Sequence, residues 1–316
     1  MATEGRASGT VILLGDHAVV HGVPAIADVL ERGARSTRTP LASGPSCLYL
    51  QGVDVPISEH DDLDLARAFR AVLDASLGAQ RSAVRVNASA ELPPGGGLGC
   101  SAALGVAIAR ALDEGANATV ACERAMAWER VFHGNPSGID TAVAAHGGFL
   151  WFRKGAGIEE LGERARGLTL DLCIGLSGAA SSTKTMVEMV ARLRERRSEL
   201  VEKAFAGIDS LVKNARLAIL AGDRVALGRL MDLNQMVLAG LYLSTPELED
   251  LCARARAAGA LGAKLTGAGG GGCVVALVQN RAAAARVLAS WREGGFDGFS
   301  VRAGGAPLAT AEELGL

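Results

Sequence analysis

The apolar positions of this chain fall into short runs interrupted by glycine or charged residues, which predicts strands and helices in a mixed fold. The apolar run at 10–14 predicts a buried strand, and the mostly apolar segment 170–176 is also typical of a strand. Apolar residues recur near a helical period from 61 to 77 and alternate with polar ones from 82 to 88. These two patterns predict a helix and a half-buried strand.

The rest of the pattern continues in the same way and predicts a boundary between two lobes. We expect helices at 105–112 and 119–132, a strand at 149–152, a charged helix after Lys184 with further helices to about residue 258, a strand at 274–278, and one more helix and strand. The polar, glycine-containing stretch 153–167 separates the halves. Because a single core is hard to extend over 316 residues, we predict domains at 1–166 and 167–316 with a cleft between them.

The charge balance narrows the classes of partner. The chain carries 32 Lys and Arg against 34 Asp and Glu, so a nucleic acid or an anionic membrane is not an expected partner. No apolar run approaches the roughly 18 residues that span a bilayer, and no apolar leader follows the first residues. The cysteines lack metal-ligand spacing, so we expect a reduced, cytoplasmic protein without disulfides or zinc; they are Cys47, Cys100, Cys122, Cys173, Cys252 and Cys273.

One cluster among the 41 glycines carries candidate chemistry. The segment 95–99 lies between a predicted strand and a helix that begins near Cys100 or Ser101. Exposed amides at a helix start attract anions, and glycine lets a phosphate approach the backbone, so we interpret this loop as a polyphosphate cradle. A plain connector is the alternative, but the prolines just before the loop and Ser101 after it indicate a fixed shape.

Two common nucleotide-binding motifs fit this loop poorly. A P-loop needs Gly-Lys-Ser/Thr after its glycines, whereas Cys100 and Ser101 follow here. The pattern GxGxxA at 97–102 matches a Rossmann variant but lacks the acidic residue expected about 20 positions later. A second match, GxGxxG at 267–272, runs into a predicted strand rather than a helix. Dinucleotide binding is therefore disfavoured.

Four segments, in order, resemble the GHMP small-molecule kinases, and among them most closely the mevalonate kinases. The segments are 11–25, 94–103, 133–140 with the following Gly147-Gly148, and 264–273. The resemblance implies a two-lobed fold of α/β and α+β class, with an N-terminal ribosomal-protein-S5-like α/β domain and a C-terminal ferredoxin-like α+β domain. It implies ATP and Mg²⁺ as cofactors and mevalonate as the small-molecule substrate, phosphorylated on its primary (C5) hydroxyl for isoprenoid precursor synthesis.

The resemblance also assigns roles to residues of the matched segments. Asp140 matches the catalytic aspartate that accepts the hydroxyl proton, and Ser101 and Glu129 match the magnesium ligands. The phosphate loop would be formed by Gly95, Gly96, Gly97, Leu98, Gly99, Cys100 and Ser101. The substrate-binding residues would be Asp16, His17, Thr183, Gly267 and Ala268, with the loop 267–272 closing the cleft. Many members of the family are homodimers, and the sequence leaves the oligomeric state open.

The chain departs from the family pattern at one position of consequence. The family usually places a lysine where this chain has Thr10, and that lysine pairs with the catalytic aspartate. The threonine hydroxyl carries no charge, so the absence of the lysine ammonium weakens the ionisation of Asp140. Our hypothesis is that Lys184 supplies the missing cation and acts in catalysis. Smaller departures are Asp16 in place of glutamate and Cys100 in place of serine.

Thr10 is also compatible with a slow enzyme or with a different acceptor. The enzymes with a different acceptor would be a phosphomevalonate kinase, a mevalonate 3-kinase or a related decarboxylase. A phosphorylated acceptor calls for extra basic side chains, and Arg35 and Arg38 are the only nearby basic pair in the sequence. A protein of another class, an ATP-binding regulator without turnover, is the remaining alternative.

Overall fold

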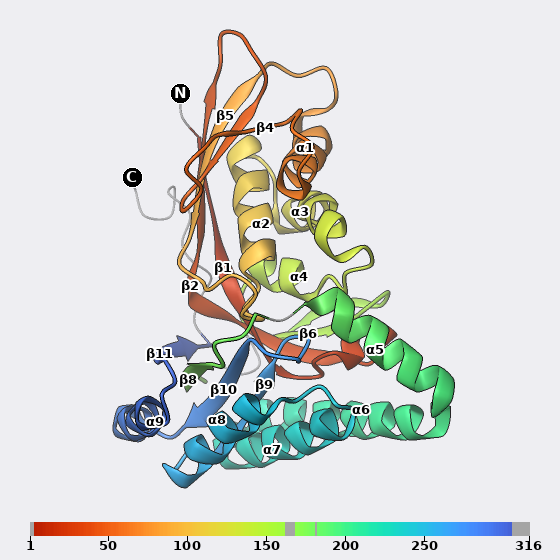
Figure 1. Ribbon diagram of the computed structural model, residues 1–316, viewed down its shortest axis with the longest axis vertical. Helices are drawn as coiled ribbons and strands as arrows, with labels where there is room; N and C mark the ends of the chain where they lie inside the picture. The colour runs from red at the N-terminus through yellow and green to blue at the C-terminus, as the bar shows by residue number, and fades with distance from the viewer. Residues whose placement is uncertain (1–2, 162–167, 181, 305–316) are drawn as a thin grey trace.

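The computed structural model describes residues 3–161, 168–180 and 182–304, which form two lobes stacked along the long axis of the molecule (Figure 1). The N-terminal lobe holds the chain to β7, and the C-terminal lobe begins with β8 (Leu170–Leu176). The predicted boundary between residues 166 and 167 lies outside the described residues.

A seven-stranded sheet forms the N-terminal lobe, and its two longest strands come first in the chain. β1 (Thr3–Leu14) pairs antiparallel with β2 (Ala25–Pro40), and the short helix η1 (Ala18–His21) lies in their connection. The order across the sheet is β4-β3-β5-β2-β6-β7, with β1 paired to β2. The other strands are β3 (Cys47–Leu50), β4 (Ile57–Ser58), β5 (Val84–Ala90), β6 (Leu150–Arg153) and β7 (Gly157–Glu160).

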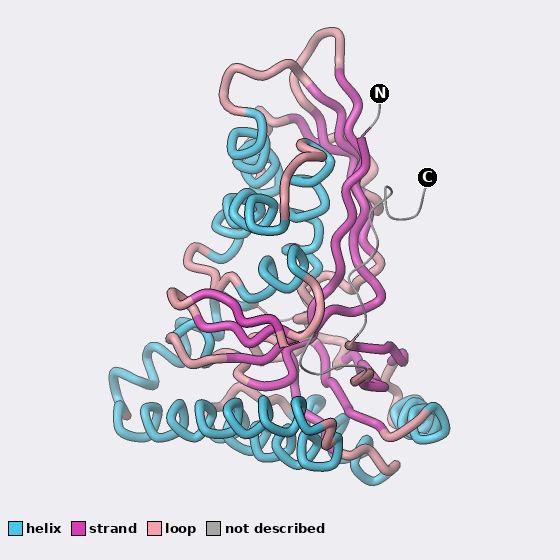
Figure 2. The backbone as a smooth tube through the Cα atoms, turned by 180° about the vertical axis from the view of Figure 1, so that it is seen from behind, coloured by secondary structure: helices cyan, strands magenta, loops and turns pink. Residues whose placement is uncertain are grey.

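The helices of this lobe cover one side of the sheet (Figures 1 and 2). They are α1 (Asp64–Leu77), α2 (Cys100–Leu112), α3 (Ala118–His133) and α4 (Ile139–His146). Helix α2 is made mostly of small residues and is buried almost throughout, because it packs between the sheet and α3. A side chain at Gly105 would press against the indole of Trp128, so the close approach of α2 to α3 depends on this glycine.

The C-terminal lobe has the ferredoxin-like arrangement that the resemblance implies. Its antiparallel sheet has the order β11-β8-β10-β9, in which the last strand lies beside the first. The remaining strands are β9 (Gly262–Thr266), β10 (Cys273–Val278) and β11 (Gly298–Ala303). The helices are α5 (Thr183–Arg196), α6 (Ser198–Ala221), α7 (Arg224–Gly240), α8 (Pro246–Ala257) and α9 (Arg281–Glu293). The predicted fold class is therefore confirmed.

The predicted elements that carry motifs occur close to their expected positions, and one long strand is not foreseen by the sequence pattern. The strand at 170–176 and the helix beginning at Cys100 are observed as predicted. Strand β2 escapes prediction because charged residues in its middle, such as Glu31 and Arg32, break the apolar pattern.

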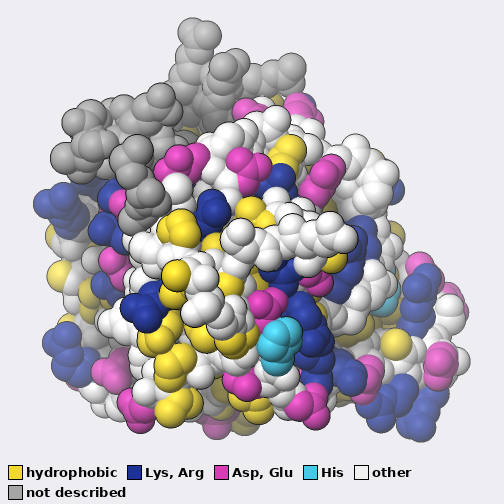
Figure 3. Space-filling view, turned by 90° about the horizontal axis from the view of Figure 1, so that it is seen from above, with side chains coloured by type: hydrophobic (Ala, Val, Ile, Leu, Met, Phe, Trp, Pro, Cys, Tyr) yellow, Lys and Arg dark blue, Asp and Glu magenta, His cyan; other side chains and the backbone are white. Residues whose placement is uncertain are grey.

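None of the helices in the described residues is long and apolar enough to cross a membrane. Figure 3 shows acidic and basic side chains interspersed over one end of the molecule.

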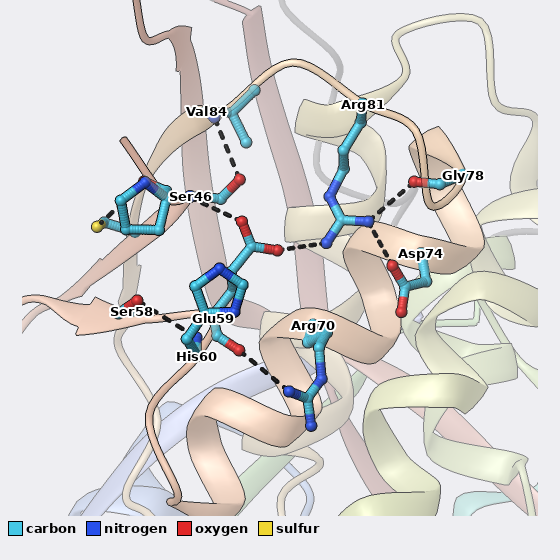
Figure 4. Close-up of polar contacts among 11 residues, drawn as sticks. Ser46, Ser58, Glu59, His60, Arg70, Asp74, Gly78, Arg81 and Val84 are labelled. Carbon is cyan, nitrogen blue, oxygen red and sulfur yellow. Dashed lines mark hydrogen bonds and ion pairs between the residues drawn. The ribbon is translucent and has the colours of Figure 1, made fainter. Parts of the chain in front are cut away.

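A cluster of charged side chains at the end of the N-terminal lobe away from the C-terminal lobe ties α1 to the sheet edge (Figures 1 and 4). Arg81 forms ion pairs with Glu59 and Asp74 and donates a hydrogen bond of 2.8 Å to the carbonyl of Gly78. The other Glu59 oxygen accepts from the amide of Ser46 at 2.8 Å. We call these residues, Ser46, Glu59, Asp74, Gly78 and Arg81, the Arg81 cluster.

Candidate active site

The site predicted from the sequence lies at a cavity of about 170 Å³ between the two lobes. Its walls come from β1, the loop before α2, helices α3 to α5 and the loop between β9 and β10. The predicted site residues on these walls are His17, Gly95, Gly96, Gly97, Gly99, Cys100, Ser101, Glu129, Asp140, Thr183, Gly267 and Ala268. We call this space the central cavity.

The loop before α2 presents its backbone to the central cavity because glycine occupies its tightest positions. Gly97 has a φ of 73°, and an added Cβ would lie 2.5 Å from the carbonyl oxygen of Thr266 in the other lobe. Gly99 has a φ of 66°, and a Cβ there would lie 2.8 Å from the hydroxyl of Thr10. Larger residues would be strained and would clash at both positions. The loop ends at the first turn of α2, where free amides attract anions.

Ser101 and Glu129 form one polar unit at the start of α2. The Ser101 hydroxyl donates to Glu129 Oε1 at 2.5 Å and accepts from the Trp128 indole N–H at 3.1 Å, which fixes its orientation. His133 Nε2 lies 3.6 Å from the second Glu129 oxygen. Burial raises the pKa of Glu129 to about 7, although the hydrogen bond from Ser101 acts in the opposite direction.

The oxygen donors of this unit are suited to a hard divalent cation. A buried carboxylate beside a fixed hydroxyl offers the oxygen ligands that Mg²⁺ prefers. In the described part of the chain, no three His, Cys, Asp or Glu side chains gather closely enough to hold a metal by themselves. Mg²⁺ usually takes one or two protein carboxylates and completes its shell with substrate phosphates and water. Ser101 and Glu129 are therefore the residues that would hold it.

Asp140 lies in the first turn of α4 and reaches the central cavity. Burial raises its pKa to about 7, Glu129 and Asp16 contribute in the same direction, and His133 opposes them. Thr10 is fully buried beside it and its hydroxyl donates to the Asp140 carbonyl at 3.4 Å. Thr10 thus occupies the place that the resemblance gives to a lysine, but it brings no charge to the carboxylate.

Four of the residues that the resemblance assigns to substrate binding line the central cavity, namely His17, Thr183, Gly267 and Ala268. His17 has a φ of 57°, which is rare for a residue with a side chain, and it is buried. Neither of its ring nitrogens has a hydrogen-bond partner among the described residues, and burial lowers its pKa to about 4. A neutral imidazole with free nitrogens can accept or donate a hydrogen bond to a ligand.

Three predicted residues lie elsewhere. Leu98 of the glycine loop is buried in the core and does not line the central cavity. Asp16 is fully buried behind the wall, where it pairs with Lys264 of β9, and it is not on the surface of the central cavity. Lys184 is exposed and lines an adjoining cavity of about 420 Å³, whose wall also includes Asp140 and Thr183. Lys184 is not among the charged groups that shift the pKa of Asp140.

Several side chains that shape the site are not identified by sequence reasoning. Trp128 and His133 flank the predicted Glu129 on α3, and His133 begins a segment that resembles the family, so its position gives a usable signal. Thr266 accepts from the amide of Ile12 at 3.2 Å and joins β9 to β1 across the lobes. No periodicity or spacing in the sequence indicates this contact, because it joins segments about 250 residues apart.

Comparisons with known proteins agree with the geometry. Residues 64–148 match the model of the GHMP kinases N terminal domain, and residues 215–297 match that of the GHMP kinases C terminal domain. The chain is 33% identical over 300 residues to a mevalonate kinase of Pyrococcus abyssi, with 87% of this chain and 88% of that protein covered. This chain belongs to the GHMP kinase family. It is a phosphotransferase built on the two-lobed fold of that family.

Two further similarities point the same way. The GHMP kinase is 32% identical over 287 residues to a mevalonate kinase of Methanothermobacter thermautotrophicus, covering 87% of this chain and 90% of that protein. Its fold matches the crystal structure of L. major mevalonate kinase in complex with R-mevalonate with a TM-score of 0.81 and 27% identity, over 97% of both chains. The relatives therefore share the whole fold and not one lobe alone.

Proposed function

We propose that this kinase transfers the γ-phosphate of ATP to the primary hydroxyl of mevalonate, giving 5-phosphomevalonate. The observation that carries the proposal is one cavity in which Asp140, the Ser101–Glu129 pair and the backbone of the glycine loop face one another. Phosphoryl transfer requires positioning and charge neutralisation more than covalent chemistry, and these groups are suited to both. The relatives named mevalonate kinase supply the choice of acceptor.

In this mechanism Asp140 receives the proton of the acceptor hydroxyl. A pKa near 7 suits a general base at neutral pH, because a large fraction is ionised and still basic enough to accept a proton. The amides of residues 95–99 and the start of α2 would hold the phosphates, and Thr183 would face the transferred group. Mg²⁺ held by Ser101 and Glu129 would neutralise negative charge on the phosphates.

Lys184 remains our proposal for the cation that replaces the family lysine. It lines the cavity that adjoins the central cavity, together with Thr183 and Asp140. Because Lys184 is exposed and lines the adjoining cavity, its proposed partner is the negative charge of the bound substrates.

The charge of the central cavity disfavours a phosphorylated acceptor. Of the described residues that line it, none is Lys or Arg, whereas Glu129 and Asp140 are acidic. A phosphate on the acceptor would add negative charge beside these carboxylates, and Lys184 is the one lysine or arginine among the described residues that line this cavity or the adjoining one, which is unfavourable for a second phosphate. The basic pair Arg35 and Arg38 is not on this wall.

Mass spectrometry of the products formed with MgATP and a panel of small alcohols tests the proposal. The panel contains mevalonate, 5-phosphomevalonate and galactose, and phosphorus NMR then assigns the phosphorylated oxygen. We expect a single product from mevalonate with the phosphate on C5. Phosphate on C3 of mevalonate would show that the enzyme is a mevalonate 3-kinase. A product from 5-phosphomevalonate alone would show that it is a phosphomevalonate kinase. Nucleotide binding without release of ADP for any alcohol would instead indicate a regulator.

A further inference from the structure

A buried ion pair joins the two lobes directly behind the central cavity. Lys264 of β9 and Asp16 after β1 are both fully shielded from solvent, and the Lys264 ammonium donates to Asp16 Oδ2. Lys264 also donates to the carbonyls of Leu265 and of Ile12, the latter at 3.4 Å. The ammonium therefore donates its hydrogen bonds to one carboxylate and two backbone carbonyls.

The other oxygen of Asp16 holds the wall of the cavity. Asp16 Oδ1 accepts from the amide of Gly267 at 3.0 Å, and Gly267 and Ala268 line the central cavity. The residue that follows Asp16 is His17, which lines the cavity from the other lobe. Asp16 thus lies between two wall segments that face the same space, one from each lobe, without facing that space itself.

Stability alone is a weak reason for placing an ion pair there. Burial raises the pKa of Asp16 and lowers that of Lys264, so the surroundings oppose the charge on each partner. Replacing a buried ion pair with apolar residues of similar size is often neutral or stabilising, whereas removing one partner is costly. A buried charged pair is better suited to fixing one geometry than to adding stability, which directs attention to what Asp16 holds.

We propose that Lys264 is a positioning residue of the phosphotransfer site, which holds Asp16 so that Asp16 fixes the Gly267 amide in the wall of the central cavity. The inference rests on the proposed function and adds a residue to it. Lys264 acts through Asp16 and touches neither substrate, and Asp16 acts from behind the wall.

The test is a set of variants assayed for the Michaelis constants of mevalonate and ATP well below their melting temperatures. In Lys264→Met the carboxylate of Asp16 loses its partner, and we expect the KM for mevalonate to rise about tenfold or more while the KM for ATP changes less than threefold. A merely structural loss lowers the fraction of folded enzyme and leaves both KM values unchanged.

Arg256→Met is the matched control. Arg256 of α8 binds the carbonyl of Ala263 at 2.8 Å and Asp232 at 2.6 Å, so it holds the same strand at its other end and away from the cavity. We expect this variant to lose stability and to keep the KM for mevalonate. If Lys264→Met behaves as Arg256→Met does, the proposal is overturned.

The pair Asp16→Asn and Asp16→Asn/Lys264→Met keeps the test decisive even if Lys264→Met fails to fold. The asparagine carbonyl can still accept from Gly267, but its NH₂ group faces the ammonium, so we expect the single variant to raise the KM for mevalonate. In the double variant that NH₂ group can donate to the carbonyls that Lys264 leaves, and the KM should return toward the wild-type value. A further rise in the double variant would show that Lys264 binds the acceptor directly, which contradicts the positioning role.

A second measurement separates this inference from the proposed function. Hydrogen exchange in the peptide 267–272 should be faster in Lys264→Met than in the wild type and unchanged in Arg256→Met, whatever the acceptor is. If the wild type does not phosphorylate mevalonate, the proposed function fails, and this exchange still decides whether Lys264 holds the wall. Equal exchange in all three proteins would overturn the inference alone.

Discussion

Glu59 and Glu129 lie in the same lobe and differ in whether a cation faces them. Their side chains are 12% and 7% exposed. Burial acts to raise the pKa of Glu59, but the Ser46 amide and Arg81 outweigh it, so that the pKa is lowered (Figure 4). The pKa of Glu129 is instead raised to about 7 by burial, and the pKa of nearby Asp140 is raised to a similar value.

The difference separates a structural cluster from a site prepared for ligands. In the Arg81 cluster, the protein itself supplies the cation, and the ion pairs tie α1 to the sheet. In the central cavity, carboxylates remain without a lysine or arginine among the described residues of the wall, and the imidazoles of His17 and His133 have lowered pKa values because of burial. Because these carboxylates have no basic side chain beside them, the central cavity favours binding of a cation or uptake of a proton from the substrate.

The largest effect is expected from Asp140→Asn. Removing the proposed base should lower kcat about a thousandfold, in line with general-base contributions of roughly 10² to 10⁴. Because the pKa of Asp140 is raised in the folded state, this group lowers stability as the pH rises from 3.8 to about 7, so at pH 8, where that loss is complete, the variant should melt no lower than the wild type. Steady-state kinetics and thermal unfolding at pH 8 measure both quantities.

Asp74→Asn is the companion of that variant in the Arg81 cluster. It removes one carboxylate from Arg81 at a site that is half exposed, so we expect a loss of at most about 1 kcal/mol in unfolding free energy and an unchanged kcat. Equal falls in kcat for the two variants would mean that the difference between the two regions has no functional meaning. Turnover by Asp140→Asn at the wild-type rate would remove the base from the mechanism.

An intermediate effect is expected from Arg81→Met, which tests stability and not chemistry. The variant leaves the mostly buried Glu59 without its cation, so the pKa of Glu59 should rise and the fold should lose about 2 kcal/mol. Urea unfolding measures this loss, and kcat and both KM values should stay within twofold because the cluster is not on the cavity wall. A fall in kcat as large as that of Asp140→Asn would contradict the separation of the two regions.

Sequence patterns predict the elements that carry the motifs, because those patterns reflect local burial. The strand at 170–176 and the helix starting at Cys100 follow from an apolar run and from a glycine loop before small residues. The Arg81 cluster does not follow from any pattern: Glu59 and Arg81 are 22 residues apart, and neither belongs to a motif. Isolated charged residues of this kind are most often exposed, so the sequence alone gives no reason to pair them.

The same limit applies to the candidate site. The glycine loop at 95–99 could be named from its own pattern, a glycine cluster before a helix start, whereas the roles of Ser101, Glu129 and Asp140 came from the resemblance to the family. Lys264 begins one of the segments that resemble the family, but its pairing with Asp16 joins residues 248 positions apart. The placement of Asp16 behind the wall is a property of lobe packing, which a local pattern does not encode.

Asp28 of β2 sharpens the comparison, because it shares the raised pKa of Asp140 but not its location. It is fully buried, and burial raises its pKa to about 8, although the amides of Val29 and Gly304 act in the opposite direction. Its Oδ1 accepts from the amide of Val29 at 2.7 Å. Asp28 does not line the central cavity. A raised pKa by itself is therefore not sufficient to mark a functional residue.

An effect confined to the pH dependence of stability is expected from Asp28→Asn. The folded state keeps the Asp28 proton up to about pH 8, whereas the unfolded chain releases it near 3.8, so raising the pH between these values favours unfolding. In the wild type this group should lower the free energy of unfolding by about 1.4 kcal/mol per pH unit. The variant should not show this decrease. Urea unfolding at pH 6 and pH 7 measures the difference, and kcat should be unchanged. Parallel pH dependences in the two proteins would show that Asp28 ionises normally, and a loss of activity would place it in the site after all.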